Sequence, residues 1–200
     1  DWQRAQAFIS TLSAASDIPH FSSVLLACIY PNRYPIFKAL LALDNPSPPH
    51  EVILAGACRN LDVELAAQSL PHVDQSSPSM FFDCLKALKS STIDQEQLDD
   101  LRQKQCTIVS MMLEHLNLEV SELEREQFLK EAFWMGRQDL FNVIYPYGPR
   151  ATLLSFDTPE VAARWKSMED IACAHHDNKA LSATVEDVIA SKPSLPSKKM

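Results

Sequence analysis

The chain has 200 residues, of which 46% are apolar and 22% charged, a balance typical of a folded chain rather than a disordered one. Its net charge of −8 and pI of about 5.2 argue against nucleic-acid binding and against an anionic membrane surface, because both need clustered Lys and Arg. No apolar run approaches the roughly 18 to 20 residues of a membrane span, so no membrane insertion is expected.

Apolar residues recur at spacings of three and four along most of the chain, which predicts an all-α fold. A first helix is predicted over residues 2–15, within an N-terminal cap that spans residues 1–20. Proline-rich breaks then separate pairs of short helices, and the clearest breaks span residues 43–51, 69–79, 144–151 and 156–160. Because such a pair cannot bury its apolar face alone, the pairs are expected to stack.

The block KSSTIDQEQLDDLRQKQ, residues 89–105, is polar and acid-rich, and it predicts an inserted, solvated extra helix. Residues 151–190 are expected to close the stack with two or three capping helices from residue 159 onward. The last ten residues, 191–200, are rich in Pro, Ser and Lys and predict a flexible tail.

Five cysteines occur without a CxxC pair, so free thiols in a reducing, cytoplasmic compartment are the plain interpretation. Cys173, His175 and His176 form the one cluster that suggests chemistry. Positions this close on one helix rarely give the geometry of a Cys–His enzyme, and two ligands do not make a metal site. The sequence therefore predicts no catalytic residue, no cofactor and no metal, with a thiol-dependent active site as the weakest alternative.

Self-similarity appears as four apolar couplets in comparable surroundings, separated by 27, 45 and 32 residues. They are Ile36-Phe37, the position of Val63, Ile108-Val109 and Leu140-Phe141. The longest separation becomes similar to the others when the polar block near 89–103 is treated as an insertion. Two of the only three glycines, Gly136 and Gly148, stand twelve residues apart around the last couplet.

Residues 131–149 resemble a repeat of the ankyrin family, a unit of about 33 residues with an inner helix, a turn at a glycine, an outer helix and a closing glycine. Gly136 falls at the turn between the helices and Gly148 at the closing position, where glycine can adopt φ > 0. The other matches are Ala132-Phe133 at the paired alanines, Asp139-Leu140-Phe141 at the start of the outer helix and Val143-Ile144-Tyr145 at its apolar triplet.

Three further segments resemble the family less closely: residues 25–41, 52–70 and 80–116. Asn32 and Arg59 stand where the turn glycine is expected, and Leu116 replaces the closing glycine. The Thr-Pro-Leu-His tetrapeptide that usually opens the inner helix is absent. The resemblance implies an ankyrin-like solenoid over residues 21–150, and a degenerate hairpin stack of another family stays open as an alternative.

Ankyrin-like stacks bind partners through the concave face lined by their inner helices and through their loop tips. The resemblance therefore implies that Tyr30, Trp134 and Met135, near the ends of inner helices, contact a partner. The alternative interpretation packs Tyr30 and Trp134 between neighbouring hairpins. The loop-tip candidates are Asp44, Asn45, His50, His72 and Asp74, of which the two histidines could instead cap helices.

The leading hypothesis is a non-catalytic protein–protein interaction module, a scaffold or adaptor in the cytoplasm, or in the host cytosol for a secreted effector. The net charge of −8 favours a protein partner with a basic patch. A helical accessory domain that positions the substrate of an enzyme's separate catalytic part is the alternative.

Overall fold

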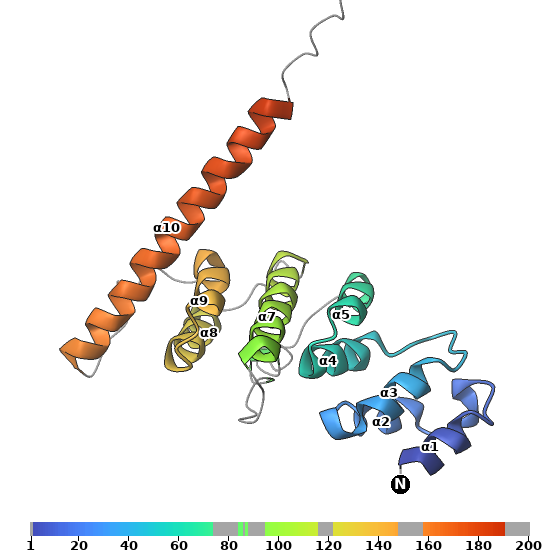
Figure 1. Cartoon of the computed structure of the whole chain (residues 1–200). Coiled ribbons are helices and arrows are strands. Elements are labelled where there is room, and N and C mark those ends of the chain that lie inside the picture. Colours follow the sequence, from blue (N-terminus) through green and yellow to red (C-terminus); the bar gives the residue numbers. More distant parts are fainter. Residues whose placement is uncertain are drawn as a thin grey trace, which may run out of the picture.

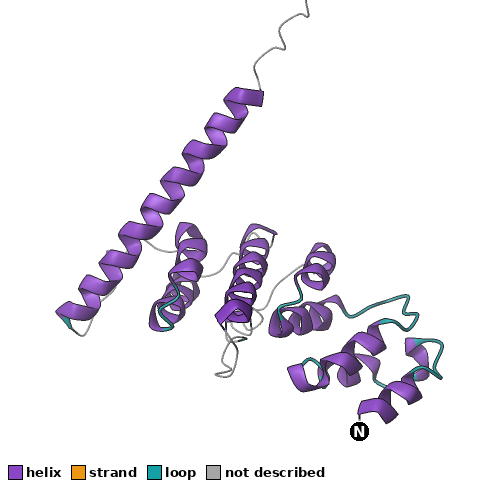
Figure 2. Ribbon diagram, in the orientation of Figure 1, coloured by secondary structure: helices purple, strands orange, loops and turns teal. Residues whose placement is uncertain are grey.

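The protein is described by a computed structural model, which covers residues 2–73, 84–85, 87, 95–115, 122–147 and 158–190. Within these ranges the regular elements are helices, and the β pairing consists of one isolated bridge between Ala14 and Asp44 (Figure 2). The predicted all-α class is confirmed. The α-helices are α1 (Trp2–Ile9), α2 (Phe21–Leu26), α3 (Tyr34–Leu41), α4 (His50–Asn60), α5 (Val63–Ser69), α7 (Gln95–His115), α8 (Glu122–Trp134), α9 (Gln138–Ile144) and α10 (Pro159–Ala190). Short 3-10 segments are η1 (Ala15–Asp17), η2 (Pro31–Arg33), η3 (Leu70–His72) and η4 (Tyr145–Tyr147).

The helices form a row in which each pair packs on the next, in chain order (Figure 1). Helix α1 packs on α3, α2 and α3 pack on α4, and α4 packs on α5. From there α5 contacts α7, α7 contacts α9, and α9 contacts both α8 and α10. The contacts are thus mainly between neighbours, as expected when helical pairs bury their apolar faces by stacking.

Two hairpins, α4–α5 and α8–α9, share the same turn. Each hairpin has one left-handed residue in the turn that follows its inner helix. The backbone φ is 53° at Leu61 and 66° at Gly136. In both, the next amide donates to a carbonyl five residues back: Asp62 to Ala57 and Arg137 to Ala132, each at 3.0 Å. This 6→1 bond with a left-handed residue is the Schellman arrangement, which satisfies carbonyls at a helix C-terminus. The turn predicted at Gly136 is confirmed.

The match between Leu61 and Gly136 corrects the turn positions that were expected in the earlier hairpins. Arg59 lies inside α4, and Leu61, two residues later, adopts the left-handed conformation predicted for position 59. Leu61 keeps this strained backbone because its side chain is only 5% exposed in the core. The couplet that matches Leu140-Phe141 is consequently Leu65-Ala66 rather than the position of Val63. Asn32 lies in η2 and not at a left-handed turn. Gly148, Leu116 and Asp74 lie outside the described residues.

Three predicted helix bounds also differ. Helix α1 ends at Ile9 instead of residue 15, since the hydroxyls of Ser10 and Thr11 bond back to the carbonyls of Ala7 and Phe8 at 2.9 and 2.7 Å. The described part of the 89–105 block is no separate extra helix, because from Gln95 it is continuous with α7. Residues 159–190 form one helix of 32 residues, not two or three, and no Pro or Gly interrupts them after Pro159.

The buried apolar residues fall into two clusters. The smaller cluster belongs to α1–α3 and includes Leu25, Phe37 and Leu40, with Ile53 of α4 as its contact to the rest. The larger cluster begins at Leu54 and runs through α5, α7, α8 and α9 to α10. Trp165 fixes α10 there, because its ring centroid lies 5.2 Å from those of Phe133 and Phe141.

A Gly136→Val variant should lose about 2 kcal/mol of unfolding free energy, because a β-branched residue is strained at φ of 66°. A Cβ at this position would also lie 3.3 Å from Nη2 of Arg164. Urea denaturation measures the loss, and Gly136→Asn is the matched control because asparagine tolerates the left-handed region. Hydrogen exchange should show reduced protection in α8–α10; an equal reduction in α2 and α3 would contradict the local origin of the effect.

Candidate functional site

Trp134 is more exposed than Tyr30 and Met135, the other two residues expected to bind a partner from the ends of inner helices. It is the last residue of α8, and its side chain is 63% exposed, while Met135 beside it is 36% exposed. The Trp134 ring meets the buried Phe133 ring edge-on, with centroids 5.1 Å apart and an interplanar angle of 71°. Trp134 is therefore oriented by a core residue without being packed between hairpins, which excludes that alternative for this side chain.

Tyr30 does not end an inner helix as expected, because it lies beyond the end of α2 as the N-cap residue of η2, and it is 50% exposed. The guanidinium carbon of Arg59 lies 4.7 Å from the centroid of its ring, a cation–π contact between the first and second hairpins. Arg59 and Trp134 both stand two residues before the left-handed turn residue, so they occupy equivalent positions. We call Tyr30, Arg59, Trp134 and Met135 the inner-helix edge.

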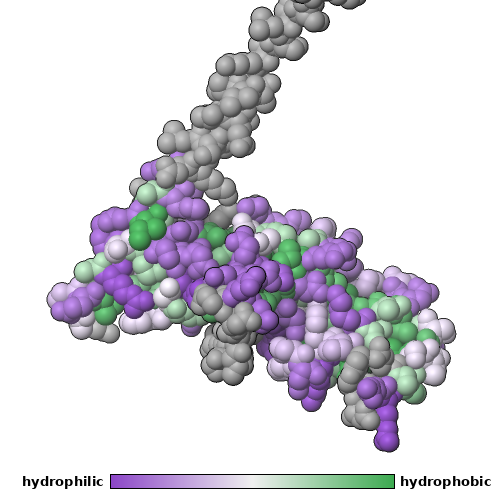
Figure 3. All heavy atoms as spheres, viewed as in Figure 1, coloured by the Kyte–Doolittle hydropathy of each residue, from purple (hydrophilic) through white to green (hydrophobic). Residues whose placement is uncertain are grey.

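Ala57 and Cys58, directly before Arg59 in α4, are fully buried and contribute nothing to this surface. Hydrophilic residues predominate on the face seen in Figure 3, where the apolar residues form small separate patches.

Polar side chains that the sequence did not single out cap the ends of inner helices. Asn60 donates from Nδ2 to the carbonyl of Ile29, just after α2, at 2.7 Å. Gln105 donates from Nε2 to the carbonyls of Cys84 and Leu85 at 2.7 and 3.0 Å. Arg164 donates to the carbonyl of Phe133 at 3.1 Å, and its guanidinium carbon lies 4.7 Å from the Phe133 ring centroid. Each of these side chains comes from a different element than the carbonyl it satisfies.

A partly buried network of side chains joins α7 to the α8–α9 hairpin. Arg137 donates to Oε1 of Gln105 at 2.7 Å and forms two bonds to Asp139, at 2.8 and 2.6 Å. Burial raises the pKa of the Asp139 carboxyl, but the bonds and positive charge of Arg137 outweigh it and hold the pKa below its ordinary value. Burial, reinforced by the charge of Asp139, raises the pKa of the Cys106 thiol to about 12, so this thiol stays protonated.

A second network joins the first and second hairpins at Asp62, the N-cap residue of α5. One oxygen of Asp62 accepts from the Leu65 amide at 3.1 Å, and the other accepts from Tyr34 at 2.8 Å and Lys38 at 2.7 Å. Burial raises the pKa of Asp62, but the hydrogen bonds from Lys38, Leu65 and Tyr34 together lower it below its ordinary value.

The loop-tip candidates make contacts within the protein. The Asp44 carbonyl accepts from the Ala15 amide at 2.8 Å, and Oδ1 of Asn45 accepts from the Ser47 amide at 3.1 Å. His50 begins α4 and stacks on His72 of η3, with ring centroids 4.3 Å apart. Burial and the neighbouring His72 lower the pKa of His50, which favours the neutral form of this ring. The structure thus brings together two histidines that the sequence placed in separate proline-flanked loops.

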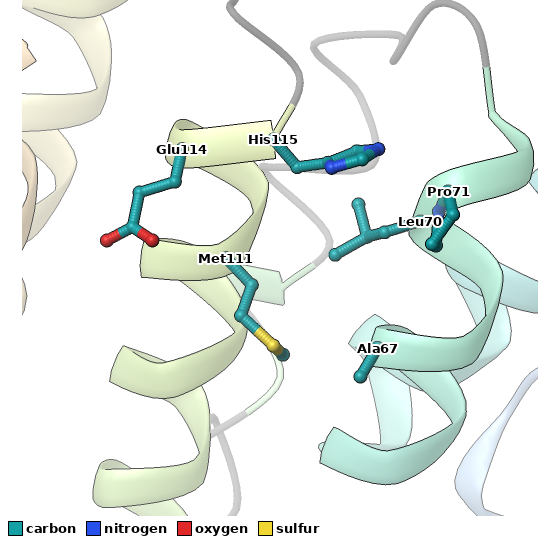
Figure 4. Close-up of a pocket in the computed structure, with 6 residues that line it drawn as sticks. All are labelled: Ala67, Leu70, Pro71, Met111, Glu114 and His115. Carbon is teal, nitrogen blue, oxygen red and sulfur yellow. The ribbon is translucent and has the colours of Figure 1, made fainter.

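A shallow groove of about 330 Å³ lies between η3 and the C-terminal end of α7 (Figure 4). It is lined by Ala67, Leu70, Pro71, Met111, Glu114 and His115. The Met111 side chain points toward α5, whereas the Glu114 carboxylate points away and accepts from Ser110 at 3.0 Å. The groove is mainly an apolar joint between two helices.

The Cys173 cluster shows no catalytic pairing in the described part of the chain. The Cys173 thiol donates to the Tyr145 hydroxyl at 3.4 Å, and that hydroxyl donates to Oε1 of Glu169 at 3.1 Å. Burial and these hydrogen bonds raise the pKa of Tyr145, so the hydroxyl is not a base for the thiol. His175 and His176 are exposed, and the described residues contain no group of three or more side chains suited to hold a metal.

Comparisons of the chain with protein-family models, curated proteins and solved structures gave no match. Within the described ranges, no helix combines the length and the apolar content that crossing a membrane requires.

Proposed function

We propose that the chain is a non-catalytic protein-binding module, built as an ankyrin-like stack of helical hairpins, that holds a protein partner on its inner-helix edge. The Schellman turn shared by α4–α5 and α8–α9 supports the ankyrin-like part of the proposal, because it places residues 61 and 136 at equivalent positions. The buried free thiols of Cys28, Cys58 and Cys84 support a reducing compartment, the cytosol.

Exposure of Trp134 is the observation that carries the binding part of this proposal. A tryptophan that is 63% exposed, yet oriented by a buried phenylalanine, keeps a large apolar surface available at low entropic cost. Tryptophan, tyrosine and arginine are the residues that contribute most often to binding energy at protein interfaces. The inner-helix edge contains one or more of each.

Replacing Trp134 by Ala should weaken partner binding strongly while the fold persists. Removing an anchor of this kind costs about 2 kcal/mol or more of binding free energy, about thirtyfold in Kd. Quantitative affinity capture from cell lysate, followed by titration of the captured protein, compares the intact chain with the variant. Urea denaturation of both checks that stability is retained.

Ile171→Ala is the matched control, since Ile171 is another large exposed apolar residue, on α10 and outside the edge. Proteins captured by the intact chain and by Ile171→Ala, but lost with Trp134→Ala, support the proposal. Capture of the same proteins with all three chains contradicts it.

A further inference from the structure

We propose that α1–α3, residues 2–44, form an N-terminal unit that unfolds on its own while α4–α10 stay folded. The core is divided at this point. The buried residues of the smaller cluster lie within the unit except for Ile53, and the larger cluster begins at the next residue, Leu54. Among the side chains that the structure describes, the partly buried Leu65 alone packs against both clusters. A boundary of this kind is where a stack of neighbouring contacts separates into cooperative parts.

The contact across the boundary is small and well defined. The Phe37 ring lies against Gly56 of α4, so closely that a Cβ at that glycine would be 2.4 Å from Cζ of the ring. The polar contacts across it include the bonds of Lys38 and Tyr34 to Asp62, the bond of Asn60 to the carbonyl of Ile29, and the cation–π contact of Arg59 with Tyr30. Lys38 is largely exposed, so its ion pair is screened by water and contributes little.

The loop between α3 and α4 allows the separation. Its start belongs to the unit, because the Ala14–Asp44 bridge and the bond from the Ala15 amide hold residue 44 against η1. The joint therefore lies at residues 45–49, directly before α4. Helices of eight, six and eight residues are too short to persist alone, so release from α4 means unfolding of the unit.

Native cysteines report on the two parts separately. Cys28 is buried within the smaller cluster, whereas Cys58 and Cys84 are buried in the larger one, where the Cys58 sulfur lies 3.5 Å from that of Met112. Unfolding of the unit alone therefore exposes Cys28 and leaves Cys58 and Cys84 protected. If the proposed function holds, a partner that contacts Tyr30 also slows this opening, because Tyr30 belongs to the unit.

Alkylation of the full chain under native conditions, with mass spectrometry of each cysteine over time, tests the unit without any partner. Cys28 should react about tenfold or more faster than Cys58 and Cys84. Asp62→Asn should accelerate Cys28 further, because an amide nitrogen in place of Oδ2 cannot accept the hydrogen bonds of Tyr34 and Lys38, while the remaining oxygen still caps α5. The same substitution should leave the rates at Cys58 and Cys84 unchanged.

Lys104→Gln is the control, because it removes a comparable exposed ion pair, with Asp100 on α7, away from the boundary. Hydrogen exchange on the same samples should show α1–α3 losing protection together. A single common rate for the three thiols, changed equally by Asp62→Asn, would overturn the proposal. So would rapid labelling of Cys28 while α1–α3 stay protected, because the thiol would then be reached without unfolding.

Discussion

Gly56→Ala is expected to lower the unfolding free energy by about 2 to 3 kcal/mol, although alanine favours a helix over glycine by about 1 kcal/mol. The reason is the Phe37 ring, three of whose atoms would lie within 3.0 Å of the added Cβ. Phe37 is fully buried and stacks on Tyr34, with centroids 5.4 Å apart, so its ring has little room to move away. The cost of overpacking therefore outweighs the gain in helix propensity, and the variant should be less stable than the natural chain.

A double-mutant cycle with Phe37→Leu tests this explanation by urea denaturation. Phe37→Leu alone should be destabilising, but adding Gly56→Ala to it should cost much less than adding it to the natural chain. The coupling should be about 1 kcal/mol or more. If Gly56→Ala alone made the natural chain more stable, as helix propensity predicts, the ring would not lie over this glycine.

Gln105→Leu is expected to destabilise the joint between the third and fourth hairpins by about 2 to 4 kcal/mol. The leucine is similar in size to glutamine, but it removes the side-chain donor that bonds to the Cys84 and Leu85 carbonyls. It also removes an acceptor from the buried Arg137. Loss of a partner from a buried polar network costs more than the net gain of each bond, because the remaining groups stay desolvated.

The matched control is Gln103→Leu, an exposed position on the same helix, where the change should be within about 0.5 kcal/mol of neutral. Urea denaturation measures both variants, and hydrogen exchange locates the effect at α7 and α9. Equal effects of the two substitutions would mean that Gln105 contributes only through helix propensity and not through the network.

The hairpin at residues 131–149 was the most predictable part of the fold, for a physical reason. Its turn needs a left-handed residue, and glycine at position 136 makes that requirement visible in the sequence. In the second hairpin the same conformation is held by Leu61, whose burial offsets the backbone strain. No local signal marks such a position, so the predicted turn fell two residues early, at Arg59.

The candidate surface could be predicted only in part. Trp134 and Tyr30 stand out by residue type and place in the hairpin, and both are exposed as a binding role requires. The contact of Arg59 with Tyr30 and the stack of His50 on His72 join residues from separate elements. Sequence spacing does not report such contacts, because they depend on how neighbouring hairpins pack.

Three polar side chains join neighbouring hairpins by bonding to backbone carbonyls. Asn60, Gln105 and Arg164 differ in length and shape, and each reaches carbonyls of one particular neighbour. The hairpins are therefore not interchangeable parts. Deleting one hairpin, or exchanging the order of two, would leave a donor facing the wrong helix end and carbonyls without a partner. In this protein the order of the stack is specified at its joints, one side chain at a time.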